Sequence, residues 1–234
     1  MKHIGVFAHH PECSEDCIQG MRLSLEPNYK ITEFREDQIT PKFLAQFDAI
    51  AFPGGIGDSA SFDTFFRRRS QQAIADFVTN GGLYLGICMG AYWAGSYYFD
   101  LLDSVDAHQY IKLPGAAVRR SYGTTVEVVW NGSPTQMYFY DGCALIGDES
   151  RFKTIGRYST GEPAAIIQGG VGVIGPHPES QLYWYQEPWA YNRPNWHDQQ
   201  HWALLRGFVD ELFAQRTIGS RLQKLYYRMT YTLV

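Results

Sequence analysis

One cysteine of this sequence lies where a catalytic nucleophile is expected. Cys88 follows the apolar run Leu83–Ile87 and is flanked by Gly86 and Gly90. An apolar run of this length predicts a buried strand, and the small residues predict a sharp turn into a helix. Such a turn raises a thiol above the sheet edge at the start of the helix, where the thiolate is favoured. The pattern predicts a nucleophile elbow built on cysteine, although an inert buried cysteine is the alternative.

A histidine and a glutamate that could serve this thiol follow a second apolar run, Val171–Ile174, which predicts the last strand of the core. A cysteine nucleophile needs a base for its proton, and the base needs an acceptor that orients it. Glu179 lies two residues after His177, so in an extended segment both side chains point to the same side. We therefore expect His177 to be the base of Cys88 and Glu179 its orienting group. The alternative is a loop histidine in a local salt bridge.

Two backbone N–H groups are candidates to stabilise the oxyanion that forms during acyl transfer. Met89 directly follows the nucleophile, and Gly55 ends a Pro-Gly-Gly turn at 53–55. Without side chains, Gly54 and Gly55 would let the backbone approach a substrate closely. We predict an oxyanion hole at Gly55 and Met89 with Gly54 beside the substrate, although a plain tight turn is the alternative for the glycines.

The order of apolar segments predicts an α/β fold that brings these groups together. Strand patterns and helix patterns alternate along the first third of the chain. We predict strands at 3–8, 29–34, 49–52 and 83–88, and helices at 13–25, 41–47 and 64–79. This alternation is typical of a doubly wound, mainly parallel sheet, which binds its ligands at the carboxyl ends of the strands.

The rest of the chain predicts a β-rich extension and a helical tail on the same single domain, residues 1–234. Short strand patterns at 124–130 and 136–140 lie within a stretch of about 108–167 that is rich in turn residues. We interpret this stretch as an antiparallel extension of the core sheet. The tail, about 197–234, contains an amphipathic helix at 202–213. Residues 217–234 predict a further helix or an oligomer contact, for example in a homodimer.

Composition excludes several classes of protein. The chain has 234 residues, of which 45% are hydrophobic and 19% charged, as in soluble globular proteins. Its net charge of −4 offers no electrostatic case for nucleic-acid binding. We find no membrane-spanning run and no signal-peptide core, and four cysteines make no disulfide framework. These features predict a cytoplasmic protein.

Cys13 and Cys17 raise the question of a metal site. They are four residues apart on a predicted helix, and His9 and His10 are nearby. A structural zinc site uses four ligands at a characteristic spacing, which this arrangement does not match. We therefore expect packing or a position at the rim of the pocket for the two thiols, no bound metal and no cofactor.

Three motifs, taken in order, resemble the class I glutamine amidotransferase superfamily. They are Phe-Pro-Gly-Gly at 52–55, Gly-Ile-Cys-Met-Gly at 86–90 and His-Pro-Glu at 177–179. Within it, the stretches 81–92, 138–142 and 175–179 are most similar to the biotin-protein-ligase N-terminal-domain family. The resemblance covers about residues 2–215. It implies a flavodoxin-like (Rossmann-like) core with a Cys88–His177–Glu179 catalytic triad.

The resemblance departs from the superfamily just after the elbow. Members that hydrolyse glutamine typically carry His-Gln there, whereas this chain has Ala91 and Tyr92. The resemblance therefore implies a cysteine-dependent amidase or amidotransferase-like hydrolase for a small carboxamide or acyl substrate, without fixing glutamine as that substrate. Tyr92 and Tyr140 are candidate substrate contacts or core residues. Any ammonia acceptor would be a separate synthetase or ligase. A non-catalytic ligand-binding or regulatory module and a cysteine peptidase remain open.

Overall fold

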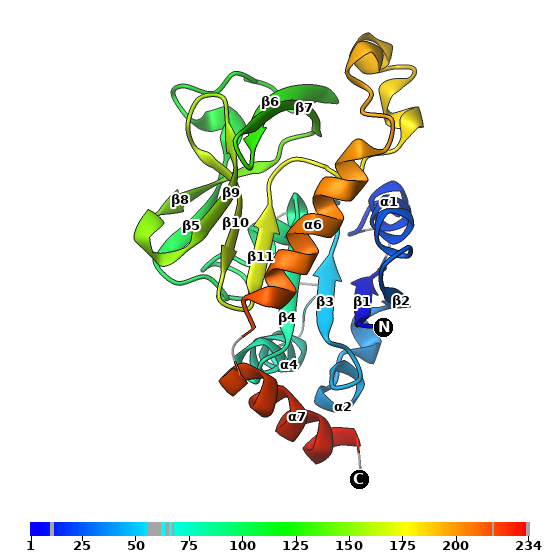
Figure 1. The fold of residues 1–234 in the computed structure, drawn as a ribbon, viewed down its shortest axis with the longest axis vertical. Helices are drawn as coiled ribbons and strands as arrows, with labels where there is room; N and C mark the ends of the chain where they lie inside the picture. Colours follow the sequence, from blue (N-terminus) through cyan, green and yellow to red (C-terminus); the bar gives the residue numbers. More distant parts are fainter. Residues whose placement is uncertain (10–11, 56–61, 64–65, 67, 217, 233–234) are drawn as a thin grey trace.

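This computed structural model describes residues 1–9, 12–55, 62–63, 66, 68–216 and 218–232. Over these residues, a mixed nine-stranded sheet forms the centre of the fold. The strand order is β2-β1-β3-β4-β11-β10-β9-β6-β7, and β5 and β8 form a separate pair (Figure 1). The bounds are β1 (His3–Phe7), β2 (Lys30–Phe34), β3 (Ala49–Phe52), β4 (Leu83–Ile87), β5 (Val105–Gln109), β6 (Thr124–Trp130), β7 (Ser133–Phe139), β8 (Cys143–Gly147), β9 (Lys153–Tyr158), β10 (Pro163–Gln168) and β11 (Val171–Ile174).

The parallel part of the sheet explains the apolar runs of the sequence. Neighbouring strands from β2 to β11 in this order run parallel. Every residue of β3, β4 and β11 is buried. Parallel strands covered by helices on both faces need such continuous hydrophobic sequences. The predicted strands at 49–52 and 171–174 have these same bounds in the structure.

The antiparallel strands continue the same sheet beyond β11. β10, β9, β6 and β7 each pair with the preceding strand in antiparallel register. Burial alternates along β6, as expected for a strand with one face on the core and one toward solvent. The predicted α/β fold, with a mainly parallel core and an antiparallel extension, is confirmed.

Helices cover both faces of the sheet. They are α1 (Glu15–Leu25), α2 (Pro41–Leu44), α4 (Arg68–Thr79), α5 (Met89–Trp93), α6 (Gln200–Ala214) and α7 (Ile218–Thr232), with short 3-10 turns at Glu36–Gln38, Tyr110–Lys112, Glu149–Arg151, Leu182–Tyr185 and Ala190–Asn195. The first residues of the helix predicted at 64–79 include positions outside the described ones. α6 lies across the sheet beside α1 (Figure 1). Phe208 of α6 packs where a side chain at Gly172 of β11 would stand.

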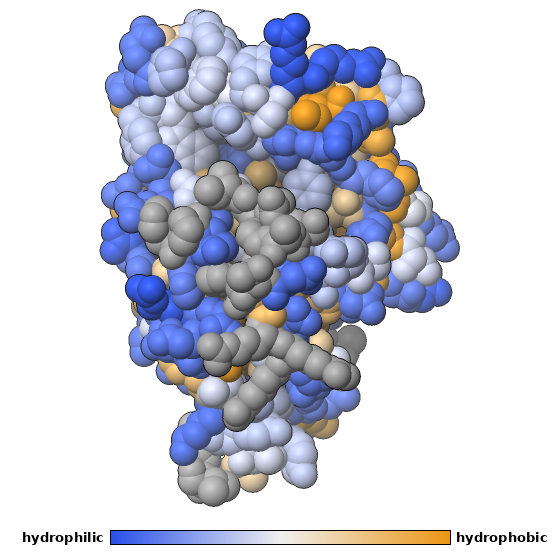
Figure 2. All heavy atoms as spheres, turned by 180° about the vertical axis from the view of Figure 1, so that it is seen from behind, coloured by the Kyte–Doolittle hydropathy of each residue, from blue (hydrophilic) through white to orange (hydrophobic). Residues whose placement is uncertain are grey.

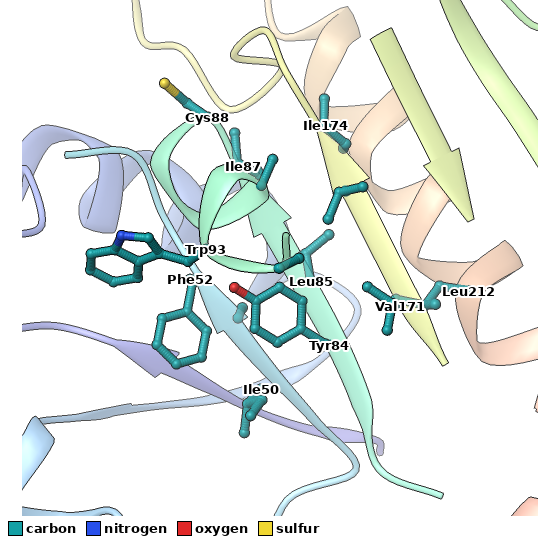
Figure 3. Close-up of a cluster of buried hydrophobic side chains, with 14 of the residues drawn as sticks. Ile50, Phe52, Tyr84, Leu85, Ile87, Cys88, Trp93, Val171, Ile174 and Leu212 are labelled. Atoms are coloured by element: carbon teal, nitrogen blue, oxygen red, sulfur yellow. The ribbon is translucent and has the colours of Figure 1, made fainter. Parts of the chain in front are cut away.

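The face of the sheet opposite α6 carries an aromatic core. Phe52 and Tyr84 stack with ring centroids 5.2 Å apart, and Trp93 of α5 meets Phe52 edge-on. Figure 3 shows these rings together below the end of β4. Buried aromatic pairs contribute more than their area alone, so this cluster fixes α5 and the end of β4 rigidly.

The outer surface seen from behind is mostly hydrophilic, with a few hydrophobic groups between hydrophilic ones (Figure 2). Among the described residues, none of the helices combines the length and the hydrophobicity needed to cross a lipid bilayer. The predicted C-terminal helix is present as α7, and its outer side exposes Leu222, Leu225, Tyr226 and Met229. The homodimer stays a prediction.

Candidate active site

Cys88 occupies a strained turn between β4 and α5. Its backbone angles, φ 51° and ψ −104°, lie in a region of φ/ψ space where residues other than glycine are rarely found. Both flanking glycines are required, because a Cβ at Gly86 would stand 2.3 Å from the Gly90 carbonyl oxygen and a Cβ at Gly90 would stand 2.0 Å from that of Phe52. Figure 3 shows the sulfur directed away from the apolar cluster at the end of β4. Strain of this kind persists where the surrounding packing enforces it, and it is common at functional sites.

The register of β4 and β11 brings His177 to the elbow. Ile174 pairs with Ile87, and the Cys88 N–H donates to the Ile174 carbonyl at 2.8 Å. Three residues later, the His177 N–H donates to the Tyr138 carbonyl at 2.8 Å. The histidine is therefore held by β7 of the extension as well as by the core sheet.

Glu179 orients the His177 ring. Its Oε1 lies 2.8 Å from His177 Nδ1, and both side chains are buried. Burial alone would lower the pKa of His177, but the Glu179 carboxylate and the neighbouring Cys88 outweigh it and raise that pKa well above its usual value. Because Nδ1 is engaged by Glu179, the other ring nitrogen is the one available to a thiol.

A second thiol reaches the same histidine. Cys17, in the first turn of α1, and Cys88 both lie close enough to His177 to raise the pKa of its ring. Burial raises the pKa of the Cys17 thiol, and the nearby His177 opposes this shift. A Cβ at Gly54 would stand 2.8 Å from both Cys17 Sγ and His177 Cε1, so glycine is needed for these groups to meet.

A cavity of about 410 Å³ opens above these groups. Cys88, His177, Cys17 and Gly55 line it. Its remaining walls are largely aromatic and include Tyr138, Tyr140, Tyr183, Trp184 and Trp189. The volume lies in the usual range for small-molecule sites. The sequence analysis assigned no role to Trp184 or Trp189, since neither belongs to a recognisable motif.

The other predicted residues lie at different distances from the cavity. Tyr140 lines it and accepts the Cys88 thiol hydrogen at its carbonyl oxygen, 3.6 Å away. Met89 is the first residue of α5, and its sulfur would be 2.8 Å from a Cβ at Gly55. Tyr92 is outside the cavity lining and donates from its hydroxyl to the Asp141 carbonyl at 3.2 Å. The oxyanion hole at Gly55 and Met89 stays a prediction.

Only part of the cysteine–histidine cluster near the N-terminus comes together. Cys13 is buried away from the cavity, and the ring of His9 accepts the Glu36 N–H at 3.2 Å. His10 is outside the described residues. Cys17 instead meets His177 and Glu179, with one potential metal-ligating atom of each within 4.8 Å of the others. Since His177 and Glu179 already bond each other, a metal there would have to replace that hydrogen bond.

The fold and this geometry can be compared with known proteins. A glutamine amidotransferase structure covers 90% of this chain and 98% of its own, at 16% identity and a TM-score of 0.62. The structure of PurLQS from Thermotoga maritima covers 90% of this chain and 99% of its own, at 16% identity and a TM-score of 0.61. A protein assigned as a GMP synthase subunit from Thermoplasma acidophilum covers 92% of this chain and 96% of its own, at 13% identity and a TM-score of 0.59. No curated protein matches the sequence significantly.

These similarities define the class of fold, that of the class I glutamine amidotransferases. Within it, residues 7–103 match the family model described as "Biotin-protein ligase, N terminal". The matched segment includes the Pro-Gly-Gly turn and the Cys88 elbow, whereas His177 and Glu179 lie beyond it. The resemblance stated from the sequence motifs is thus confirmed.

Proposed function

We propose that this chain is a cysteine-dependent amidase, an amidotransferase-like hydrolase that acts on a small carboxamide or acyl substrate. The observation that carries the proposal is the arrangement on the cavity wall. Cys88 stands on a strained elbow beside His177, whose other ring nitrogen is held by the fully buried Glu179. This arrangement supports the assignment of Cys88 as the nucleophile, His177 as its base and Glu179 as the group that orients the base.

The reaction would proceed through a thioester. The Cys88 sulfur, with its proton held by His177, attacks the amide carbon, and the carbonyl oxygen becomes an oxyanion near the Gly55 and Met89 backbone. As the oxyanion collapses, the C–N bond breaks and His177 donates its proton to the leaving nitrogen, which departs as ammonia. Water then attacks the thioester with His177 as base, which releases the carboxylic acid and restores the thiol.

The released ammonia would need an acceptor if the reaction is a transfer. We propose a separate synthetase or ligase protein in that role, since PurLQS and a protein assigned to GMP synthase have similar folds. All four cysteines are free and buried. This suits a reducing compartment, and we propose the cytoplasm.

The experiment is a measurement of ammonia release from a panel of primary amides. The wild-type protein should release ammonia from at least one of them, and Cys88→Ala should abolish the release. Cys143→Ala is the matched control, because that thiol is buried in β8 outside the cavity. Ammonia release by Cys88→Ala at the wild-type rate contradicts the proposal. Tight binding of an amide without release of ammonia from any of the panel would indicate a ligand-binding module instead.

A further inference from the structure

Apart from His177, which is paired with Glu179, the charged side chains that the described residues contribute to the cavity wall are acidic. Among the described residues that line it, the carboxylates of Asp16 and Glu187 are the acidic groups, and none is a lysine or an arginine. They come from opposite parts of the chain, the first turn of α1 and the loop after Leu182–Tyr185. A cleft lined by charges of one sign concentrates ligands of the opposite sign.

The backbone of one of these residues, Asp16, is held at the cavity. Burial raises the pKa of the neighbouring Tyr183 phenol, and the Asp16 carboxylate raises it further. Gln181 connects the same two residues, since its side-chain amide donates to the Asp16 carbonyl at 3.0 Å and to the Tyr183 hydroxyl at 3.2 Å. The exposed Asp16 carboxylate therefore extends from a backbone that is held beside the aromatic wall.

The aromatic wall is itself suited to a cation. Trp184 packs edge-on against Tyr138, with ring centroids 5.1 Å apart, and against His177 at 5.4 Å. Burial raises the pKa of Tyr138 to about 12, so this phenol is neutral at physiological pH. Neutral tyrosine and tryptophan faces attract ammonium and guanidinium groups.

We propose that the cavity selects a cationic amide, a small molecule with an ammonium, guanidinium or quaternary ammonium group on the side away from the amide that Cys88 attacks. The inference rests on the proposed function for the identity of the reacting bond. Free glutamine is less suited than an amide with a net positive charge, because its α-ammonium is accompanied by an α-carboxylate and no lysine or arginine among the described lining residues could pair with that carboxylate.

The charge preference can be measured without turnover. Cys88 would be labelled with a cationic (trimethylammonium-ethyl) or an anionic (sulfonato-ethyl) methanethiosulfonate in the Cys17→Ala background, with the modified residue identified by mass mapping. Each rate is divided by that of the same reagent with a small free thiol. At low ionic strength we expect the cationic reagent to be favoured about tenfold or more, and less so in high salt.

Charge-neutralising variants locate the source of the preference. Asp16→Asn and Glu187→Gln should each reduce the ratio several-fold, whereas Glu15→Gln should leave it unchanged. Glu15 precedes Asp16 on α1 and is exposed outside this cavity, so it is a matched control. Equal normalised rates for the two reagents overturn the inference, and so does a failure of both to label Cys88.

Amide hydrolysis provides the second readout and separates the two proposals. The panel should pair 4-(aminomethyl)benzamide with 4-carbamoylbenzoate, which differ mainly in the sign of their charge. Faster ammonia release from the cationic amide supports the inference. Hydrolysis of both amides at the same rate, with no reagent preference, overturns the inference and leaves the amidase proposal intact. A cationic reagent preference with no hydrolysis of any amide overturns the amidase proposal alone.

Discussion

Replacing Glu179 by glutamine should slow the chemistry of Cys88 without removing the thiol. The Glu179 carboxylate is fully buried and lies 2.8 Å from His177 Nδ1. Its negative charge is the largest of the influences that oppose the effect of burial on the pKa of His177. In Glu179→Gln that charge is absent, so the pKa of His177 falls and the ring is less able to hold the proton of Cys88 during attack.

The size of the effect follows from the strength of a charge-assisted hydrogen bond. Such bonds contribute about 1.5–3 kcal/mol, and each 1.4 kcal/mol corresponds to about tenfold in a rate or equilibrium. Alkylation of Cys88 by iodoacetamide at pH 7 should therefore slow by about tenfold to a hundredfold. The rate would be followed by mass spectrometry on the peptide that contains Cys88.

Glu127→Gln is the matched control, because Glu127 is exposed on β6 and far along the chain from the site. It should react at the wild-type rate. Thermal unfolding of both variants shows whether the fold survives. A folded Glu179→Gln protein that is alkylated as fast as the wild type would refute the assignment of Glu179 as the group that sets the charge of His177.

Further predictions concern packing and buried charge. Gly54→Ala should abolish amide hydrolysis, since its Cβ would stand 2.8 Å from His177 Cε1. Gly207→Ala, whose Cβ would enter open space, should stabilise α6 by about 0.5–1 kcal/mol, measured by denaturant unfolding. Burial lowers the pKa of His201 from 6.5 to about 3, so its neutral form stabilises the fold above pH 6.5 and this contribution is lost as the pH falls toward 3. Between pH 6.5 and 3, the free energy of unfolding of His201→Gln should therefore fall by about 2–4 kcal/mol less than that of the wild type. Burial lowers the pKa of Lys224 to about 6, and Lys224→Met should raise the free energy of unfolding at pH 7 by about 1–3 kcal/mol; an unchanged value would contradict the burial of that amine.

The sequence predicted the parallel half of the sheet well because buried parallel strands are continuous apolar runs. The bounds of β3 and β11 were predicted correctly for this reason. Strands β8, β9 and β10 were not predicted individually, since they are short and separated by turn formers. Two of them also pair with strands distant in sequence, β8 with β5 and β9 with β6.

The candidate site shows the same division between local and tertiary information. The Cys88 elbow is encoded by its own glycines, and Glu179 meets His177 because the two are neighbours in the chain. Cys17 reaches His177 only because α1 packs against the segment that carries the histidine. No local pattern encodes that approach. Tyr92 shows that closeness in sequence is not sufficient, since it is four residues from Cys88 but lies outside the cavity lining.

The most direct test of the central claim, that Cys88 is the nucleophile of an acyl transfer, is to trap its thioester. The wild-type protein would be mixed with p-nitrophenyl acetate, quenched in acid and mapped by mass spectrometry. We predict a hydroxylamine-sensitive acetyl group on Cys88, absent from Cys88→Ala and reduced in His177→Gln. Acetylation spread equally over Cys13, Cys17, Cys88 and Cys143, or absent from Cys88, would contradict the claim.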